Sequence, residues 1–518
     1  MPEPAPDKRM LAGIAAAAVA LGVTQLVAVA FGPQADARTA IGSAIIDLTP
    51  GPVKEWTIQT FGTADKLFLS ILIIGVIALI AAVTARWETR RVPVGSIAIV
   101  LAGILGCAAV LSRPGATVAD IVPTVIGTVC GVAVLRLLTS GRVSDESEQR
   151  DARDLTAPDP GRRLSLLTLG FLGAGALTGV AGVVLTRMLS SVSGDRDSFA
   201  LPRVNAGAPL VPPTVQPKGV ALPSFVTSNA DFYRIDTALT VPQLSRADWQ
   251  LKIHGMVDRE ITLRFQDLDR FDVIEKLVTL TCVSNPVGGD LISNAAWTGY
   301  RVRDLLAEAG VHPDADMVLS MSIDGFTAGT PIEALTDNRD ALLAVGMNGQ
   351  PLPTEHGYPA RLVVPGLYGY VSATKWVVDL ELTRFDEAEA FWTQHGWSAK
   401  GPIKTESRID VPRSGQEVAK GPVTFGGIAW AQTRGVREVE VRIDSPNAQG
   451  DWRPAELGAS YSNDTWRLWS FNWQATQSGS HTITVRATDN TGAVQTPDEA
   501  SPVPDGATGW HTVQFSVT

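Results

Sequence analysis

The chain has 518 residues, a formal net charge of −10 at pH 7 and 3 cysteines. Its length predicts more than one domain, and its acidic balance argues against a nucleic acid as a partner. With so few cysteines, the fold cannot depend on a disulfide framework.

Residues 1–190 contain five apolar runs. Each is close to the length that crosses a hydrocarbon core, and none carries a charge at its centre. Buried helices of a soluble protein are the alternative, but five such runs in succession favour an all-α bundle of transmembrane helices. The runs are Met10 to Phe31, Leu67 to Ala85, Val94 to Leu111, Val118 to Leu138 and Leu164 to Thr186.

Basic residues fall mainly on one side of these runs. That side has Lys8, Arg9, Arg86, Arg90, Arg91, Arg136, Arg142, Arg150, Arg153, Arg162 and Arg163, and the other side has only Arg38, Lys54, Lys66 and Arg113. The positive-inside rule therefore predicts a cytoplasmic N-terminus, and an odd number of spans places everything after Thr186 outside the cytoplasmic membrane. A cleaved signal peptide is the alternative for the first run, but that run is long and lacks a small-residue cleavage pattern.

The predicted bundle has no features of an electron carrier. All six histidines lie outside the runs, so the composition excludes a bis-histidine haem within the bundle. Cys107 and Cys130 lie inside the third and fourth runs, where a thiol behaves as a small apolar group. The predicted role of residues 1–190 is anchoring in the lipid bilayer.

A proline-rich linker, residues 191–222, predicts an extended spacer. Residues 223–405 alternate strand-like runs, such as Trp249 to His254 and Arg361 to Val364, with helical pieces such as Val302 to Ala309, which is an α+β pattern. Residues 406–518 contain only short strand-like runs with turns between them. This pattern predicts a β-sandwich of immunoglobulin type.

Cys282 lies at the end of one strand-like run and before a turn-rich stretch, Ser284 to Gly289. A lone thiol outside the membrane runs is a core residue, a nucleophile or a metal ligand. Core packing is the default, because free cysteine is among the most buried residue types.

The motifs that follow Cys282 favour a metal ligand. In order along the chain they are Trp297 to Leu306, Met347 to Pro353, His356 to Gly366, Tyr368–Gly369 and Lys375–Trp376. This series resembles the molybdopterin domain of the sulfite oxidase family, which includes plant nitrate reductase and a bacterial periplasmic methionine sulfoxide reductase. The resemblance covers Pro223 to Thr518. It implies a molybdenum-dependent oxidoreductase in which Cys282 binds one molybdenum per chain, as a soft ligand of a redox metal, and the cofactor dithiolene supplies other sulfurs.

The resemblance also implies roles for other residues. It places Arg234 beside the metal as a catalytic group, since a bound oxyanion needs a fixed guanidinium. The implied cofactor contacts are Asn229, Phe232, Tyr233, Ser322, His356, Arg361, Ser372, Thr374 and Lys375. Ordinary core packing of the aromatic residues and solvation of the basic residues are the alternatives. For the β-sandwich the resemblance implies homodimerisation, with adhesion or wall binding as the alternative.

The sequence departs from the family where the substrate anion binds. Sulfite oxidases typically follow the cysteine with Asn-Arg-Arg, whereas here Asn285 precedes Pro286 and Val287, and Phe326 replaces a tyrosine. Arg434 is the remaining candidate for an anion-binding arginine. Each lost charge-assisted hydrogen bond weakens anion binding by about 1.5–3 kcal/mol, so a sulfoxide or another S- or N-oxide is as plausible a substrate as sulfite.

The predicted protein is therefore a membrane-anchored, extracytoplasmic oxidoreductase that transfers an oxygen atom on a small sulfur or nitrogen oxo-compound. Reduction of a sulfoxide or S/N-oxide and a non-catalytic membrane receptor with a degenerate cofactor domain are the alternatives. Electrons would pass to or from an external cytochrome or quinone-linked carrier. Because enzymes of this type cross the membrane folded, we also hypothesise that Arg162 and Arg163 form a twin-arginine export (Tat) signal, with ordinary flanking charge as the alternative.

Overall fold

The computed structural model of the protein describes residues 6–50, 53, 56, 57, 60, 65–89, 91–113, 116–140, 160–446 and 448–518. The chain forms two compact units. Unit 1 comprises Met1–Ser191 with Thr237–Val241, and unit 2 comprises Val192–Asp236 with Pro242–Thr518. Of the basic residues used to predict the topology, Lys54, Arg90, Arg142, Arg150 and Arg153 lie outside the described residues, as do the side chains of Lys66, Arg162 and Arg163.

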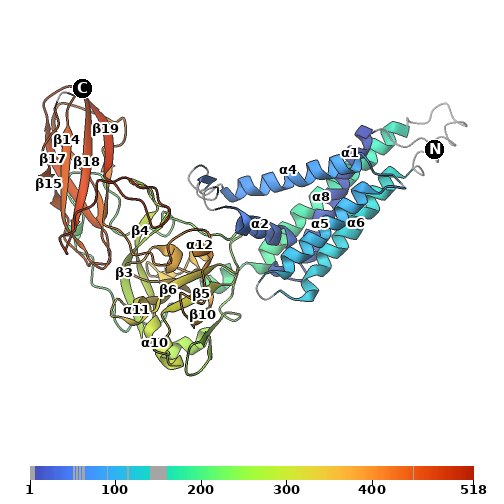
Figure 1. The fold of residues 1–518 in the computed structure, drawn as a ribbon, viewed down its shortest axis with the longest axis horizontal. Helices are drawn as coiled ribbons and strands as arrows, with labels where there is room; N and C mark the ends of the chain where they lie inside the picture. Colours follow the sequence, from blue (N-terminus) through green and yellow to red (C-terminus); the bar gives the residue numbers. More distant parts are fainter. Residues whose placement is uncertain are drawn as a thin grey trace, which may run out of the picture. The chain divides into compact units, whose positions relative to one another are not determined.

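Unit 1 is helical (Figure 1). Its helices are α1 (Pro6–Ala28), α2 (Ala37–Leu48), α4 (Asp65–Ala85), α5 (Val94–Leu111), α6 (Val122–Thr139) and α8 (Pro160–Ser190), with 3-10 turns η1 (Pro33–Ala35) and η3 (Val118–Ile121). Within the described residues, five helical segments are long and apolar enough to cross a membrane, and they coincide to within a few residues at most ends with the predicted runs. The short helix α2, capped by the Asp36 carboxylate, is not among the predicted elements.

Small residues let the helices of unit 1 approach closely, as is common where membrane helices pack. A Cβ atom added to Gly22 of α1 would lie 2.1 Å from the Gly175 carbonyl oxygen of α8. A polar network joins other helices, because the buried Glu88 carboxylate accepts a hydrogen bond from Ser96 and pairs with Arg136 at 3.1 Å.

The first part of unit 2 contains two sheets, with strand orders β2-β1-β10-β5-β6 and β3-β4-β7-β8, and β9 pairs with β7. The strands are β1 (Gln250–Gly255), β2 (Ile261–Arg264), β3 (Val273–Thr281), β4 (Ile292–Arg301), β5 (Met317–Ser322), β6 (Thr327–Pro331), β7 (Leu342–Met347), β8 (Gln350–Pro351), β9 (Arg361–Val363) and β10 (Val377–Thr383). The helices are α9 (Ser193–Ser198), α10 (Val302–Ala309), α11 (Ile332–Thr336) and α12 (Phe391–Gln394), with short 3-10 turns between the strands. These elements form the predicted α+β domain, and α10 has the predicted bounds.

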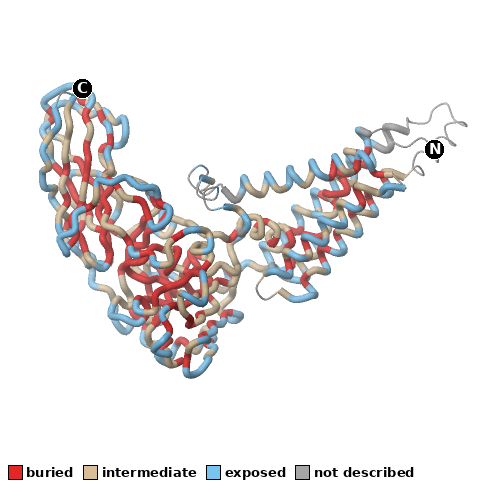
Figure 2. The backbone as a smooth tube through the Cα atoms, viewed as in Figure 1, coloured by how far each residue is buried: buried red, intermediate tan, exposed pale blue. Residues whose placement is uncertain are grey.

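Both sheets are buried over most of their length (Figure 2). Trp249, Trp297 and Trp376 are the largest fully buried side chains of this part, and β3 has no exposed residue. The proline-rich segment 201–218 belongs to unit 2 and packs against the rest of that unit. The Asn205 amide donates to the Val273 carbonyl oxygen at 2.8 Å, and the Tyr461 hydroxyl donates to the Pro209 carbonyl oxygen at 2.6 Å.

The second part of unit 2 is the predicted β-sandwich. Its sheets have the orders β11-β13-β17-β16 and β12-β19-β18-β14-β15. The strands are β11 (Glu406–Val411), β12 (Glu417–Val418), β13 (Gly421–Trp430), β14 (Val436–Asp444), β15 (Arg453–Pro454), β16 (Glu456–Leu457), β17 (Arg467–Ala475), β18 (Gly479–Asp489) and β19 (His511–Val517). Phe425, Trp469 and Phe515 fill the space between the sheets, because alternate side chains of each strand point inward.

Candidate cofactor site

Cys282 follows the last residue of β3 and is half-buried. Its backbone nitrogen donates to the Leu291 carbonyl oxygen at 2.9 Å, and its carbonyl oxygen accepts from the Asn285 amide at 3.1 Å. The Asn285 side chain accepts a further hydrogen bond from the Leu291 amide at 2.9 Å. A buried strand and a tight turn therefore fix the thiol at the end of the sheet, where it is more accessible than an ordinary core cysteine.

Hydrogen bonds hold the loop that contains Asn229 against the rest of the α+β domain. The Asn229 side chain accepts a hydrogen bond from Asn348 at 2.8 Å, and its carbonyl oxygen is 3.3 Å from His356 Nε2. Phe232 is buried and makes edge contacts with the rings of Trp297 and His356 at centroid distances of 5.5 and 5.4 Å. Phe232 is thus the packing residue that anchors this loop.

Tyr233 and Arg234 follow Phe232 in the same loop. Burial raises the pKa of the Tyr233 hydroxyl well above its usual value, and electrostatic interaction with Cys282 raises this pKa further. A Cβ atom added to Gly369 would be 3.8 Å from the Tyr233 hydroxyl oxygen and 3.9 Å from the Thr281 carbonyl oxygen, so Tyr233 lies near the end of β3. The Arg234 Nε atom pairs with Asp236 at 2.9 Å, which holds a guanidinium that is about one-third exposed.

His356 ends the 3-10 turn η6 (Thr354–His356) and is buried. Burial lowers the pKa of its imidazole to about 3, and the charges of Arg361 and Lys375 act in the same direction. The imidazole is therefore neutral at pH 7, and its buried Nδ1 atom has no hydrogen-bond partner among the described residues. Gly357 follows with a φ of +110°, a backbone conformation that favours glycine. A Cβ atom added to Gly357 would lie 3.0 Å from the Arg361 side chain and 3.1 Å from the Lys375 side chain, so the absence of a side chain at this position lets these two residues approach it.

Arg361 and Lys375 bring two cations into the interior beside His356. The Arg361 guanidinium donates to the His356 carbonyl oxygen at 3.1 Å and lies over the Trp297 ring at 5.0 Å. Lys375 Nζ pairs with Asp236 at 3.1 Å. Burial lowers the pKa of Arg361 to about 10 and that of Lys375 to about 8, and Asp236 opposes the shift of Lys375.

The three remaining predicted contacts are buried hydroxyl groups that already have partners. Ser372 donates to the Tyr368 carbonyl oxygen at 2.9 Å, and Thr374 shares a 2.7 Å hydrogen bond with Ser320. The Ser322 hydroxyl accepts a long hydrogen bond of 3.5 Å from the Asp324 amide. Ser372 and Thr374 lie in the segment that leads to Lys375, so they position the chain next to the cationic cluster.

The β-sandwich supplies residues to this site that the sequence does not reveal. Gln432 donates from Nε2 to the Thr281 hydroxyl at 3.1 Å, immediately before Cys282. On the other side of the cysteine, Arg408 donates to the Gly289 carbonyl oxygen at 2.8 Å, and a Cβ on Gly288 would be 2.3 Å from His511. No local pattern marks these residues, because their contacts lie more than a hundred residues away along the chain.

The side chains that depart from the family pattern contribute no charge or hydroxyl, and Arg434 already has other partners. Val287 faces Gly509, whose added Cβ would be 3.6 Å from it, and the ring of Phe326 is 5.9 Å from that of Phe391. Arg434 pairs with Asp489 at 2.8 Å and donates to the Ile403 carbonyl oxygen at 3.0 Å. These contacts give Arg434 a structural role where the β-sandwich meets the segment that precedes it.

The residues at this site fit a molybdopterin cofactor. Arg234 and Lys375 share one paired carboxylate, Asp236, while the buried Arg361 donates to backbone carbonyl oxygens. A buried excess of positive charge is costly unless an anion joins it. The unpartnered His356 Nδ1 is a further hydrogen-bonding atom for a polar ligand. Within the described part of the chain, no cluster of three or more His, Cys, Asp or Glu residues could hold a metal, so a metal on Cys282 would need ligands from a cofactor.

Comparisons with known proteins agree with this chemistry. Residues 238–392 match the family described as oxidoreductase molybdopterin binding domain, and residues 406–485 match a bacterial Ig domain. Mitochondrial sulfite oxidase of Mus musculus is 28% identical over 370 residues, which cover 61% of this chain and 65% of the mouse protein. The uncharacterized oxidoreductase YuiH of Bacillus subtilis (strain 168) is 33% identical over 153 residues, which cover 30% of this chain and 74% of YuiH.

Among solved structures, the sulfane dehydrogenase SoxCD from Paracoccus pantotrophus is 26% identical, with a TM-score of 0.47; the match covers 58% of this chain and 82% of that one. The matched segment thus spans slightly less than two thirds of the mouse sulfite oxidase, and YuiH is matched over most of its length. The molybdopterin-domain match includes Cys282, His356, Arg361 and Lys375. The chain belongs to the sulfite oxidase family of molybdopterin-dependent oxidoreductases.

Proposed function

We propose that the protein is a membrane-anchored molybdenum oxidoreductase that transfers one oxygen atom to or from a small sulfur or nitrogen oxo-compound outside the cytoplasm. When bound, molybdopterin would supply a molybdenum that changes oxidation state and gives or takes this oxygen atom. Cys282 would hold the metal, and the family match and the fixed position of the thiol at the end of β3 support this role.

The observation that carries the proposal is the excess of buried cations near Tyr233, whose hydroxyl interacts electrostatically with both Cys282 and Arg361. Arg361 and Lys375 are buried with lowered pKa values, which an anionic cofactor would reverse. A planar guanidinium suits a phosphate group. Neutral His356 would offer Nδ1 to the polar part of the cofactor. The residues predicted to bind the cofactor thus support binding of an anionic pterin.

Arg234 is the residue that we assign to the substrate. Asp236 holds its guanidinium by a 2.9 Å ion pair while leaving about one-third of it exposed, so it can orient an oxo group next to the metal. Since Val287 and Phe326 add no charge or hydroxyl, the pocket has fewer groups that bind a dianion. This composition favours a sulfoxide or S/N-oxide as the second candidate substrate, with the same site working in the reductive direction.

We also propose that the five apolar helices span the cytoplasmic membrane with the N-terminus inside, so that unit 2 is extracytoplasmic. The length and composition of the helices and the uneven distribution of basic residues support this topology. Export by the twin-arginine route through Arg162 and Arg163 and homodimerisation through the β-sandwich are parts of the same proposal.

The proposed function is tested by metal analysis and turnover together. The full chain would be purified in detergent from a host that makes molybdopterin, beside Cys282→Ser and the matched control Cys107→Ser, which replaces a thiol in α5. We expect about one molybdenum per chain in the wild type and control and little in Cys282→Ser. Molybdenum-loaded protein would then be assayed with sulfite and ferricyanide and with methionine sulfoxide and reduced viologen. Absence of molybdenum in every form would overturn the oxidoreductase proposal.

A further inference from the structure

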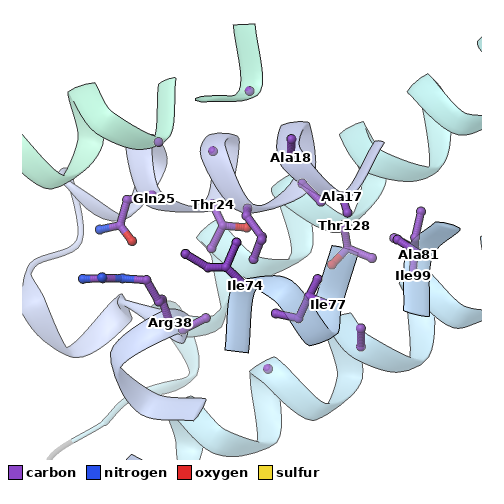
Figure 3. A pocket seen from close by; sticks show the side chains of 18 of the residues that line it. Ala17, Ala18, Thr24, Gln25, Arg38, Ile74, Ile77, Ala81, Ile99 and Thr128 are labelled. Carbon is purple, nitrogen blue, oxygen red and sulfur yellow. The ribbon is translucent and has the colours of Figure 1, made fainter. Parts of the chain in front are cut away.

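The helices of unit 1 line a partly open cavity of about 640 Å³. Most of its lining is apolar and comes from α1, α4, α5, α6 and α8. This volume falls within the range of sites that bind small molecules. Ile77 and Ala81 of α4 and Ile99 of α5 line its apolar part (Figure 3).

One end of the cavity is polar. Gln25 of α1 is only 6% exposed and lines the cavity, so its amide is held away from bulk water. Arg38 of α2 lines the same end, as Figure 3 shows, and its Nε atom is buried without a partner there. The buried hydroxyl of Thr124 on α6 is also unpartnered within the described residues. Buried polar groups are normally hydrogen-bonded, so these groups call for a ligand that can accept hydrogen bonds.

The polar end lies at one face of the predicted membrane. Gln25 is near the end of α1, Arg38 follows in the connection to the second span, and Thr124 is in the first turn of α6. With the predicted topology all three are at the outer face, where unit 2 is also predicted. The acyl chain of a lipid would leave this end unsatisfied, because it has no atom that accepts a hydrogen bond from the amide of Gln25.

A short segment outside the helices of unit 1 also lines the cavity. Leu239 belongs to unit 1 and contacts α2, since a Cβ added to Gly42 would be 2.4 Å from its side chain. Leu239 is three residues after Asp236, the carboxylate that pairs with Arg234 and Lys375. The segment that contributes Leu239 to the cavity is thus continuous in sequence with the loop that contains the candidate catalytic arginine.

We propose that this cavity binds a lipid-soluble quinone as the electron partner. A quinone carbonyl oxygen would accept hydrogen bonds from Gln25 and Arg38, and its apolar tail would lie along Ile77 and Ile99. This inference rests on the proposed function, which requires a two-electron carrier. For a substrate X, the balanced reaction is X + H₂O + quinone → XO + quinol: X gains the oxygen atom of water, and the two hydrogens of water, with two electrons from X, reduce the quinone. Reduction of XO by quinol is the reverse.

The test is binding of radiolabelled decylubiquinone to the full chain in nanodiscs, with the signal of protein-free nanodiscs subtracted. We expect saturable binding to the wild type. Gln25→Met keeps the side-chain length and removes the amide, and Ile77→Trp fills the apolar part, so each should weaken binding about tenfold or more. Ile71→Trp is the matched control, because Ile71 is on the same helix, is 63% exposed and does not line the cavity. It should bind like the wild type.

Molybdenum content and turnover with ferricyanide are measured on the same wild-type sample. Turnover with ferricyanide but no saturable decylubiquinone binding would overturn the quinone site and leave the proposed function standing. Binding unchanged in both Gln25→Met and Ile77→Trp would equally overturn it, because the quinone would then bind elsewhere. Saturable binding that both variants weaken and the control keeps supports the inference even in protein without molybdenum.

Discussion

Gln432 of the β-sandwich donates a hydrogen bond to the hydroxyl of Thr281 at 3.1 Å, one residue before the candidate metal ligand Cys282. The same side-chain nitrogen also donates to the Thr279 carbonyl oxygen at 3.3 Å. Trp466 adds a backbone hydrogen bond to the Thr279 hydroxyl at 2.8 Å. The β-sandwich therefore holds the strand that presents the thiol, which gives this domain a role at the site beyond any role in assembly.

The first prediction concerns this contact. Gln432→Met removes the amide donor while keeping a side chain of similar length at a fully buried position. The loss leaves two acceptors on β3 without this donor, so we expect a destabilisation of about 1–3 kcal/mol, seen as a lower Tm of unit 2 by calorimetry, together with reduced molybdenum content. The control is Gln474→Met on the exposed side of β17. Equal Tm and metal content in both variants would contradict a positioning role for Gln432.

The second prediction concerns Arg361. Its guanidinium reaches the carbonyl oxygens of His356 and Ala373 at once, at 3.1 and 3.4 Å, and stacks over Trp297. A lysine keeps the charge but cannot reproduce this planar geometry. We therefore expect Arg361→Lys to retain about tenfold less molybdopterin than the wild type, measured by pterin fluorescence after oxidation. The control is Arg384→Lys, whose ion pair with Asp386 lies at the surface. If both variants keep the same amount of cofactor, Arg361 does not bind it.

The sequence suffices to predict the three-part architecture, because each part has its own pattern: long apolar runs, mixed elements, and short alternating strands. The bounds of α10, Val302–Ala309, follow directly from the apolar spacing. The cluster of Asn229, His356, Arg361 and Lys375 is predicted only through the family resemblance, since lone basic residues are usually solvated. Gln432 and Arg408 escape prediction because they reach the neighbours of Cys282 through domain packing. Gln25 escapes it because an amide near the end of a span has no local signature.

The third prediction concerns pH. The pKa of buried His356 is about 3 in the folded protein against a usual value of 6.5. Because the pKa of His356 is lower in the folded state, the unfolded chain binds the proton at a higher pH than the folded protein does. The contribution of His356 to the free energy of unfolding is therefore complete above pH 6.5 and is lost as the pH falls from 6.5 towards 3. Cofactor-free protein should lose about 1 kcal/mol from this residue between about pH 7.5 and about pH 5.5. Urea unfolding at the two pH values measures this loss of stability. His356→Gln should lose less stability than the wild type, whereas the control His312→Gln, which changes a half-exposed imidazole, should lose as much as the wild type.

The fourth prediction concerns export. Arg162 and Arg163 lie at the start of α8, before its apolar span, whose many glycines make it only moderately hydrophobic. Changing both to Lys keeps the positive charge that sets topology but removes the arginine pair that the twin-arginine pathway recognises. We expect unit 2 of this variant to stay inside, so that added protease no longer digests it in spheroplasts. Changing Arg86 and Arg91 to Lys is the matched control. Digestion of the Arg162/Arg163 variant at the wild-type rate would leave ordinary flanking charge as the explanation of the pair.

The last prediction concerns substrate choice. If the anion pocket is weakened by Val287 and Phe326, restoring the family residues should favour sulfite. Val287→Arg adds a cation shortly after Cys282, and Phe326→Tyr adds a hydroxyl. Each charge-assisted hydrogen bond to the dianion contributes about 1.5–3 kcal/mol, so kcat/KM for sulfite should rise about tenfold or more in the double variant, while kcat/KM for methionine sulfoxide should not rise. Val494→Arg, at an exposed position of the β-sandwich, is the matched control for the added charge. An equal gain for both substrates, or none for sulfite, would show that these two positions do not determine substrate choice.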